Sequence, residues 1–545
     1  MRLLSIILST LAALALLGVG LAANLLLRDS GLVSPSLMIE VLLLALLIPP
    51  LYWLTPKPWR VRLLLGVSIL TLLHGGVSIE YVALLAILLC LTWITIAPPP
   101  MEPARLLSSR QLWGGLAAIS LFAILLAGQR YLSGIALPAP LIVAALLGGI
   151  GVIAGLMLSE PRLWRPLTHS LIPLGLIAAV SIGFAPSLAS ADFTALFVTL
   201  AAMSIPTLSC CLLCGVWALR ADEGQRRHIA RVGIALLIVL FVMFKWQSNT
   251  DVLSWFGFSY IAFRLLHVLL EKRLNAALPV GTFEEWSVYN LFFSAQAVGP
   301  IDRWPRFAPD LQKDKRFSWE DFVTAWERIL WGAIKKFFIA DVLLLPLIPG
   351  SVPIEMTTPL YAWYQLYVYT FYLYWDFSGF VDIAIGIGLL MGVHLPENFN
   401  RPYTRGSLAQ FWQSWHMTLS SWLRTYVFLP LSRSLLRTRL RRFPWLIVLT
   451  ANLVTMTLIG FWHGTNGRFI AWGLWHALGL FVHKLFSDRT RRLQMTWKNT
   501  WRAQAFHVFS VALTFHFVVL GWVFFALPGL KDSLRYLALL FGVRL

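Results

Sequence analysis

Long apolar runs recur along almost the whole chain of 545 residues, and they constrain the fold more than any other feature. Many of them reach roughly 18 residues, the length that a helix needs to cross the hydrocarbon layer of a membrane. Hydrophobic residues make up 58% of the sequence and charged residues 13%, against roughly 25% charged residues in an ordinary soluble domain. The sequence therefore predicts an all-α polytopic membrane protein and excludes the soluble and disordered classes.

About sixteen transmembrane or re-entrant helices are expected from these runs. In the first 220 residues, breaks rich in proline and charge separate predicted spans at roughly 3–27, 37–54, 61–73, 79–97, 112–128, 138–158, 171–186 and 193–219. The first run is too long for the apolar part of a signal peptide, so we expect a retained helix. A charged hinge follows, and further spans are predicted at roughly 230–247, 252–270, 323–347, 360–375, 378–393, 444–462, 468–486 and 506–527.

The segment from Trp286 to Val298 is half apolar and too short to cross a membrane comfortably. We expect it to be a re-entrant or interfacial piece buried in protein. The four cysteines, Cys90, Cys210, Cys211 and Cys214, lie in apolar runs and are interpreted as small buried hydrophobic residues.

The net charge of +19 comes from short clusters of lysine and arginine between the apolar runs, such as Lys335-Lys336 and the stretch 433–442. The positive-inside rule and anionic lipid headgroups account for such clusters, so membrane lipids are expected partners and nucleic acid is not. A docking surface for an acidic carrier protein is the alternative interpretation.

Two histidines lie in apolar, tryptophan-rich surroundings: His416 ends Phe-Trp-Gln-Ser-Trp-His, and His463 lies in Gly-Phe-Trp-His-Gly. Histidine is the usual proton carrier in catalysis because its ordinary pKa is near neutrality. A single histidine on an apolar face is more often a core residue. Two of them in a membrane protein favour function, because ionisable groups at membrane depth are costly.

The two histidines are predicted to lie on different kinds of helix. Ser407 can cap a helix whose apolar residues, from Leu408 to Tyr426, recur at steps of three and four. Its opposite face carries a polar row, Gln413, His416, Ser420 and Arg424, so this helix is expected at the membrane surface or along a cavity. His463 ends a spanning helix that begins near Phe443. A neutral imidazole there would serve as a general base.

Two carboxylates, Asp376 and Asp382, lie between apolar runs. They are expected either to pair with helix ends or arginine, or to position a catalytic group. The sequence contains no phosphate-binding loop, nucleophile elbow or His-Glu-x-x-His motif. The two histidines lack an evident third ligand, so no metal site is expected.

At these residues the sequence resembles the membrane-bound O-acyltransferase (MBOAT) family. It is most similar to the bacterial branch that contains alginate O-acetyltransferase and the teichoic-acid D-alanyl transfer protein. The matching stretches are 298–303, 335–341, 376–386, 395–403, 411–424, 462–464 and 472–476. The resemblance implies an additional N-terminal transmembrane region at 1–220, an MBOAT-like catalytic core with a central tunnel at 221–490, and a C-terminal helix region at 491–545.

The resemblance also implies a function. His463 matches the family's near-invariant histidine and His416 the second histidine, so both are candidate catalytic residues. Candidate positioning or substrate-binding residues are Asn398, Trp415, Ser420, Arg424, Asp376 and Trp462. The expected activity is transfer of an acyl group, acetyl being favoured, in a bacterial cytoplasmic (inner) membrane. The expected co-substrate is a cytoplasmic thioester, acetyl-CoA or acyl carrier protein, with no bound cofactor. The expected acceptor is a hydroxyl of an extracytoplasmic exopolysaccharide such as alginate, or of an acyl-accepting protein.

Three alternatives remain open from the sequence. The chain could transfer D-alanyl or another acyl group to a cell-envelope polymer. It could instead be a transporter for a polysaccharide precursor or lipid, with polar residues along the pathway. It could also be a non-catalytic scaffold of a polysaccharide-producing complex.

Overall fold

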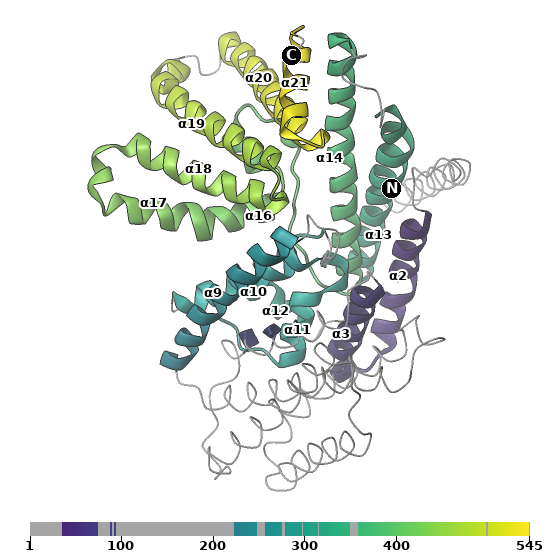
Figure 1. The fold of residues 1–545 in the computed structure, drawn as a ribbon. Coiled ribbons are helices and arrows are strands. Elements are labelled where there is room, and N and C mark those ends of the chain that lie inside the picture. The colour runs from purple at the N-terminus through teal and green to yellow at the C-terminus, as the bar shows by residue number, and fades with distance from the viewer. Residues whose placement is uncertain are drawn as a thin grey trace, which may run out of the picture.

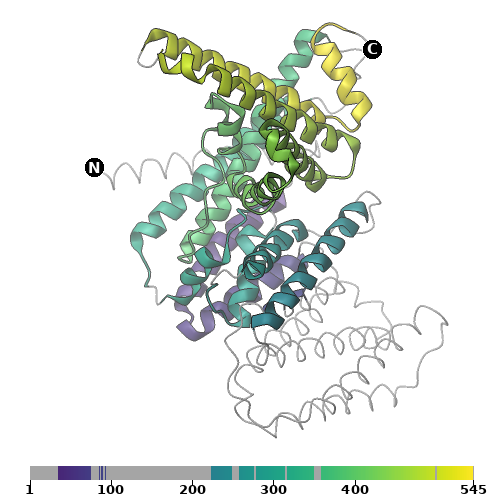
Figure 2. The ribbon, with the colours of Figure 1, turned by 90° about the vertical axis from the view of Figure 1, so that its left-hand side faces the viewer.

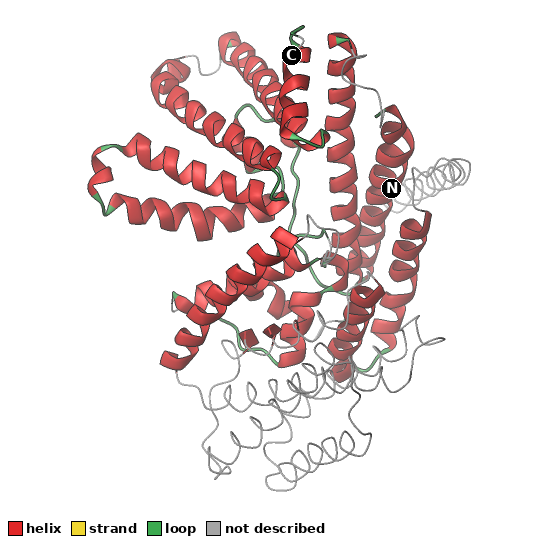
Figure 3. Cartoon of the chain, in the orientation of Figure 1, coloured by secondary structure: helices red, strands yellow, loops and turns green. Residues whose placement is uncertain are grey.

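The computed structural model describes residues 35–74, 223–247, 257–274, 278–296, 298–313, 316–348, 358–496 and 500–543, with Leu85, Leu88, Leu89, Thr92 and Trp93. These residues form helices and connecting loops, and none of them lies in a strand (Figure 3). The predicted all-α fold is confirmed for this part of the chain. The four cysteines and the predicted spans at 3–27, 112–128, 138–158, 171–186 and 193–219 lie outside the described residues, as does most of 79–97.

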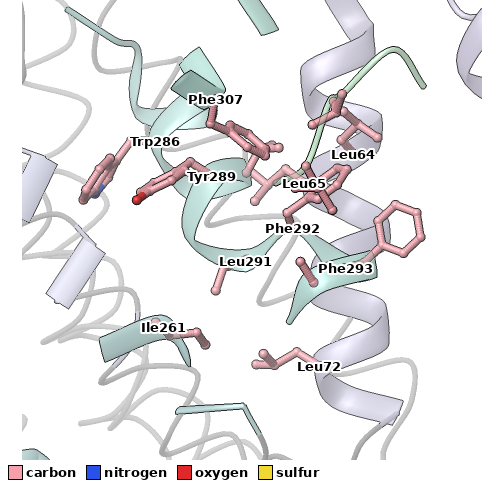
Figure 4. Close-up of a cluster of buried hydrophobic side chains, with 14 of the residues drawn as sticks. Leu64, Leu65, Leu72, Ile261, Trp286, Tyr289, Leu291, Phe292, Phe293 and Phe307 are labelled. Atoms are coloured by element: carbon pink, nitrogen blue, oxygen red, sulfur yellow. The ribbon is translucent and has the colours of Figure 1, made fainter. Parts of the chain in front are cut away.

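One group of helices forms the lower part of the coloured ribbon in Figure 1. It contains α2 (Pro35–Leu54), α3 (Lys57–His74), α9 (Glu223–Gln247), α10 (Phe258–Arg273), α11 (Phe283–Leu291), α12 (Trp304–Gln312) and α13 (Trp319–Ala333). Aromatic side chains from α11 and α12 pack against leucines of α3 in its core (Figure 4). The core residues that Figure 4 labels on these helices include Leu64, Leu65, Leu72, Trp286, Tyr289, Leu291 and Phe307.

Helix α11 is the short buried piece expected between Trp286 and Val298. It has nine residues, and a capping box between Thr282 and Glu285 fixes its first turn. The side chains of Trp286 and Val288 are fully buried. The helix is therefore surrounded by protein, as the sequence predicted for backbone that does not span.

Helix α14 (Pro359–Leu390) runs alongside α13 and the π-helical segment η5 (Ile334–Leu344) (Figure 1). Two spans were expected here, with a break near Asp376, and that prediction is wrong. The carboxylate of Asp376 accepts a hydrogen bond from Lys336 on η5, so its charge is balanced inside one continuous helix. Glycine allows the close approach, because a Cβ at Gly379 would lie 2.6 Å from the Lys336 backbone nitrogen.

The C-terminal half forms the upper group in Figure 1, and Figure 2 shows it stacked above the lower helices. An irregular segment, interrupted by η8 (Pro402–Thr404), connects α14 to this group. The group contains α15 (Leu408–Trp412), α16 (Met417–Leu423), η9 (Arg424–Phe428), α17 (Leu429–Leu436), η10 (Arg439–Arg442), α18 (Pro444–His463), α19 (Gly467–Thr496), α20 (Trp501–Ala526) and α21 (Leu530–Leu540).

Four described helices are long and apolar enough to cross a membrane: Pro359–Leu390, Pro444–His463, Gly467–Thr490 and Trp501–Ala526. Within them, many large apolar side chains remain exposed, as expected for surfaces that face lipid: Val454 and Leu458 on α18, Val482 on α19 and Val508 on α20 are examples. The total of about sixteen helices remains a prediction.

Candidate active site

His416 lies at a break in the helix that the sequence predicted to be continuous. Ser407 caps α15 as expected, accepting a hydrogen bond from the Gln410 backbone nitrogen. The helix then ends at Trp412, and a second helix begins at Met417. His416 caps this second helix in the left-handed conformation, with φ of 43°. The predicted single helix with a polar row is therefore wrong.

The break has a clear cause in the extended segment before it. The Asn398 carbonyl oxygen accepts a hydrogen bond from the Met417 backbone nitrogen, at 2.9 Å. The Asn398 side-chain oxygen accepts two more from Thr418, from the backbone nitrogen at 3.0 Å and from Oγ1 at 2.8 Å. Three hydrogen bonds from one residue thus fix the first turn of α16 and hold His416 outside the helix.

Other contacts anchor this extended segment to the lower helices. Arg328 on α13 forms ion pairs with Asp382 on α14, at 2.8 Å, and with Glu397, one residue before Asn398. The Ile301 backbone nitrogen donates to Thr418 Oγ1 at 3.1 Å. The stretches 298–303, 376–386 and 395–403, distant in sequence, therefore meet around the turn that carries His416.

The His416 side chain is enclosed by aromatic rings. It is 3% exposed, and the centre of its ring lies 4.9 Å from that of Phe377, 5.9 Å from that of Trp462 and 6.5 Å from that of Tyr260. Burial lowers the pKa of His416 to about 3, so the imidazole is neutral. Within the described part of the chain, neither ring nitrogen has a hydrogen-bond partner.

His463 is the last residue of α18, as expected, and its ring is partly exposed. The centre of its ring lies 4.5 Å from that of Trp462, 4.7 Å from that of Phe525 and 5.4 Å from that of Trp472. Trp462 contacts both imidazoles, and the two histidines are near enough to interact electrostatically. The structure therefore brings together three candidate residues: His416, His463 and Trp462.

Trp415 lies in the same aromatic cluster, with its ring 5.1 Å from those of Phe399 and Trp522. Ser420 donates to the Trp415 carbonyl oxygen at 3.2 Å, and Arg424 is exposed on η9. Asp376 pairs with Lys336, and its neighbour Phe377, instead of its carboxylate, contacts the His416 ring.

Sequence reasoning missed two residues of the lower helices that reach this cluster. Tyr260 on α10 stacks on His416, and Lys245 on α9 places its ammonium 5.8 Å from the centre of the Trp462 ring. Lys245 lies within the span predicted at 230–247, and no role of its own was predicted for it from the sequence. The lone lysine in an otherwise apolar run was the signal that could have identified it.

His476 on α19 is also fully buried, among Trp412, Trp472 and Phe517. Neither of its ring nitrogens has a hydrogen-bond partner among the described residues. No group of three or more His, Cys, Asp or Glu side chains in the described ranges is arranged to hold a metal ion.

The arrangement is that of a helical membrane protein with a partly exposed imidazole at the end of a spanning helix and a second, buried imidazole beside it. The family model of the membrane-bound O-acyltransferases matches residues 185–525. The chain belongs to this family.

The names of the curated relatives differ in the acyl group and in the polymer that they mention. The chain is 31% identical over 293 residues to the probable alginate O-acetylase AlgI of Pseudomonas syringae, covering 54% of this chain and 53% of the relative. It is 32% identical to the peptidoglycan O-acetyltransferase of Helicobacter pylori, covering 48% and 47%. It is 29% identical to the teichoic acid D-alanyltransferase of Bacillus subtilis, covering 58% and 82%. The match thus spans about half the length of the first two relatives.

Proposed function

We propose that the chain is an O-acyltransferase of the bacterial cytoplasmic membrane. It moves an acyl group, preferentially acetyl, from a cytoplasmic thioester, acetyl-CoA or acyl carrier protein, to hydroxyls of an extracytoplasmic polysaccharide or of an acyl-accepting protein. The main support is the position of His463, a partly exposed imidazole in an aromatic cluster at the end of a spanning helix. Names of relatives that act on alginate and peptidoglycan support the acetyl group.

In the proposed reaction, the acceptor oxygen attacks the thioester carbonyl carbon while His463 removes the hydroxyl proton. The carbon–oxygen bond forms, the carbon–sulfur bond breaks, and the histidine returns its proton to the departing thiolate. A general base contributes roughly 10²–10⁴-fold in rate. The rings of Trp462, Trp472 and Phe525 next to His463 limit the access of water to a bound thioester and so slow its hydrolysis.

His416 acts as the partner that orients the acceptor or stabilises the oxyanion. Its nitrogens have no hydrogen-bond partner among the described residues, and the same holds for the side-chain nitrogen of Asn398. Ser420 contributes less than the sequence suggested, because its hydroxyl is already bonded to the Trp415 carbonyl oxygen.

The test is substitution of His463 by Ala or Gln, with His507→Ala as the matched control on an exposed histidine of α20. We expect acyl transfer in membranes to fall by about 100-fold or more in the His463 variants and to remain unchanged in the control. Full transfer by a folded His463→Ala protein would overturn the assignment. A scaffold predicts that both His463 and His416 variants leave product acylation intact, whereas a transporter predicts no thioester turnover by the wild type.

D-alanyl transfer is the second candidate function, and the similarity to the Bacillus subtilis relative favours it. The two functions differ in the charge of the acyl group, because D-alanine carries an ammonium and acetate does not.

A further inference from the structure

A lysine from outside the histidine-bearing helices reaches the candidate active site. Lys245 lies in the last turn of α9, and its ammonium is 5.8 Å from the centre of the Trp462 ring. A cation at this distance over an indole ring is attracted by the ring's electron density. The contact therefore fixes a positive charge on one side of Trp462.

The other contacts of Trp462 show what this charge acts on. The same ring lies 4.5 Å from the ring of His463 and 5.9 Å from that of His416, centre to centre. The charge of Lys245 acts electrostatically on His463. The side chains of both Lys245 and His463 are partly exposed. A substrate carbonyl beside His463 would therefore lie in a positive potential that originates from Lys245.

This positive potential acts differently on the two candidate acyl groups, because only one of them carries a charge. In a D-alanyl thioester, the carbon next to the reacting carbonyl carries an ammonium. An acetyl thioester has only a methyl group there. The phosphates of the donor lie a whole pantetheine arm away from the thioester, so Lys245 is badly placed to bind them. The negative oxyanion forms with either donor and does not discriminate between them.

We propose that Lys245 is a specificity-determining residue that selects a neutral acyl group such as acetyl over the cationic D-alanyl group. The inference rests on the proposed acyl transfer at His463. With an assumed separation of about 8 Å between the two ammonium groups and an effective dielectric constant of about 20, the repulsion corresponds to roughly thirtyfold discrimination. Partial exposure weakens the effect, so a tenfold to thirtyfold preference is expected, in order of magnitude.

The experiment compares two donors on the same protein in lipid nanodiscs. Full-length wild type, Lys245→Met, Lys245→Arg and the control Lys484→Met are supplied with acetyl- and D-alanyl-pantetheine. Lys484 is an exposed lysine of α19 paired with Asp488. The polysaccharide fraction of the native cell envelope is the acceptor. A pH of about 6.5 keeps the D-alanyl ammonium charged. The ratio of the two kcat/KM values is the readout, because it does not depend on the fraction of protein that folds.

We expect wild type, Lys245→Arg and Lys484→Met to prefer the acetyl donor, and Lys245→Met to lose about tenfold or more of that preference. An unchanged ratio in Lys245→Met, with acetyl still transferred, would overturn the role of Lys245 and leave the proposed function standing. A wild type that prefers the D-alanyl donor would also overturn it. A wild type that consumes neither thioester would overturn the proposed acyl transfer, and the role of Lys245 with it.

Discussion

Substitution of Asn398 by Ala tests whether this residue holds His416 in place. Asn398 provides three hydrogen bonds to the first turn of α16, two of them through its side-chain oxygen. Alanine keeps the backbone bond to Met417 and removes both side-chain bonds to Thr418. The buried Thr418 backbone nitrogen then loses its acceptor.

The cost comes from the backbone N–H of Thr418 that is left without an acceptor. A buried backbone N–H left without a partner costs about 1–3 kcal/mol. The left-handed conformation of His416, with φ of 43°, costs about 1–2 kcal/mol, which the surrounding hydrogen bonds now offset. Relief of that strain adds no cost, so we expect Asn398→Ala to lower the free energy of unfolding by about 1–3 kcal/mol, the cost of the unpaired N–H. In the molecules that remain folded, His416 can relax into α16, and misplacement of a catalytic group by about 1 Å can reduce activity about 100-fold.

The measurements are thermal unfolding in detergent and acyl transfer in membranes. Asn400→Ala is the matched control, because Asn400 lies two residues away in the same segment with an exposed side chain. If both variants showed the same unfolding midpoint and the same transfer rate, the proposed support of His416 by Asn398 would be wrong.

Three further predictions concern the helices and the pH dependence. Gly379→Ala should lower the unfolding midpoint strongly, because its Cβ would lie 2.6 Å from the backbone of η5, whereas Gly66→Ala, with no atom within 4 Å, should raise it slightly. Arg328→Met should lower the midpoint and reduce acyl transfer by loosening the segment that precedes His416; unchanged values would contradict its anchoring role. The His416 pKa is about 3 when folded and about 6.5 when unfolded, so the unfolded chain binds the proton first as the pH falls. His416 alone should therefore contribute a drop of about 1.4 kcal/mol in the free energy of unfolding between about pH 8 and pH 5.5, so that chemical denaturation of His416→Gln should show a drop smaller by that amount than wild type.

The sequence predicted the position of spanning helices well where the hydrophobic pattern alone determines it. The spans expected at 444–462 and 506–527 correspond to α18 and α20, and His463 lies at the helix end that was predicted. Prediction from the sequence failed where a partner that is distant in the sequence determines the local structure. Asp376 was taken as a break because an isolated carboxylate interrupts an apolar run, but Lys336 balances its charge inside one helix.

The same limitation explains the error around His416. A step of three and four in the apolar residues from Leu408 to Tyr426 favours one helix, and nothing local breaks it. The break depends on Asn398, which lies in a different segment and competes for the backbone groups at Met417 and Thr418. Similarly, the approach of Lys245 to Trp462 joins two helices far apart in sequence, and no periodicity encodes it.

The different surroundings of the two histidines favour a division of roles between them. A group that exchanges protons with substrate must be reachable, and His463 is partly exposed at the end of α18. His416 is enclosed, and its backbone is held in a costly conformation by Asn398. A strained backbone that several hydrogen bonds stabilise is typical of a residue whose position matters. His463→Gln should therefore reduce kcat with either donor, whereas His416→Gln should act more on the KM for the acceptor; equal loss of kcat in both variants would contradict this division.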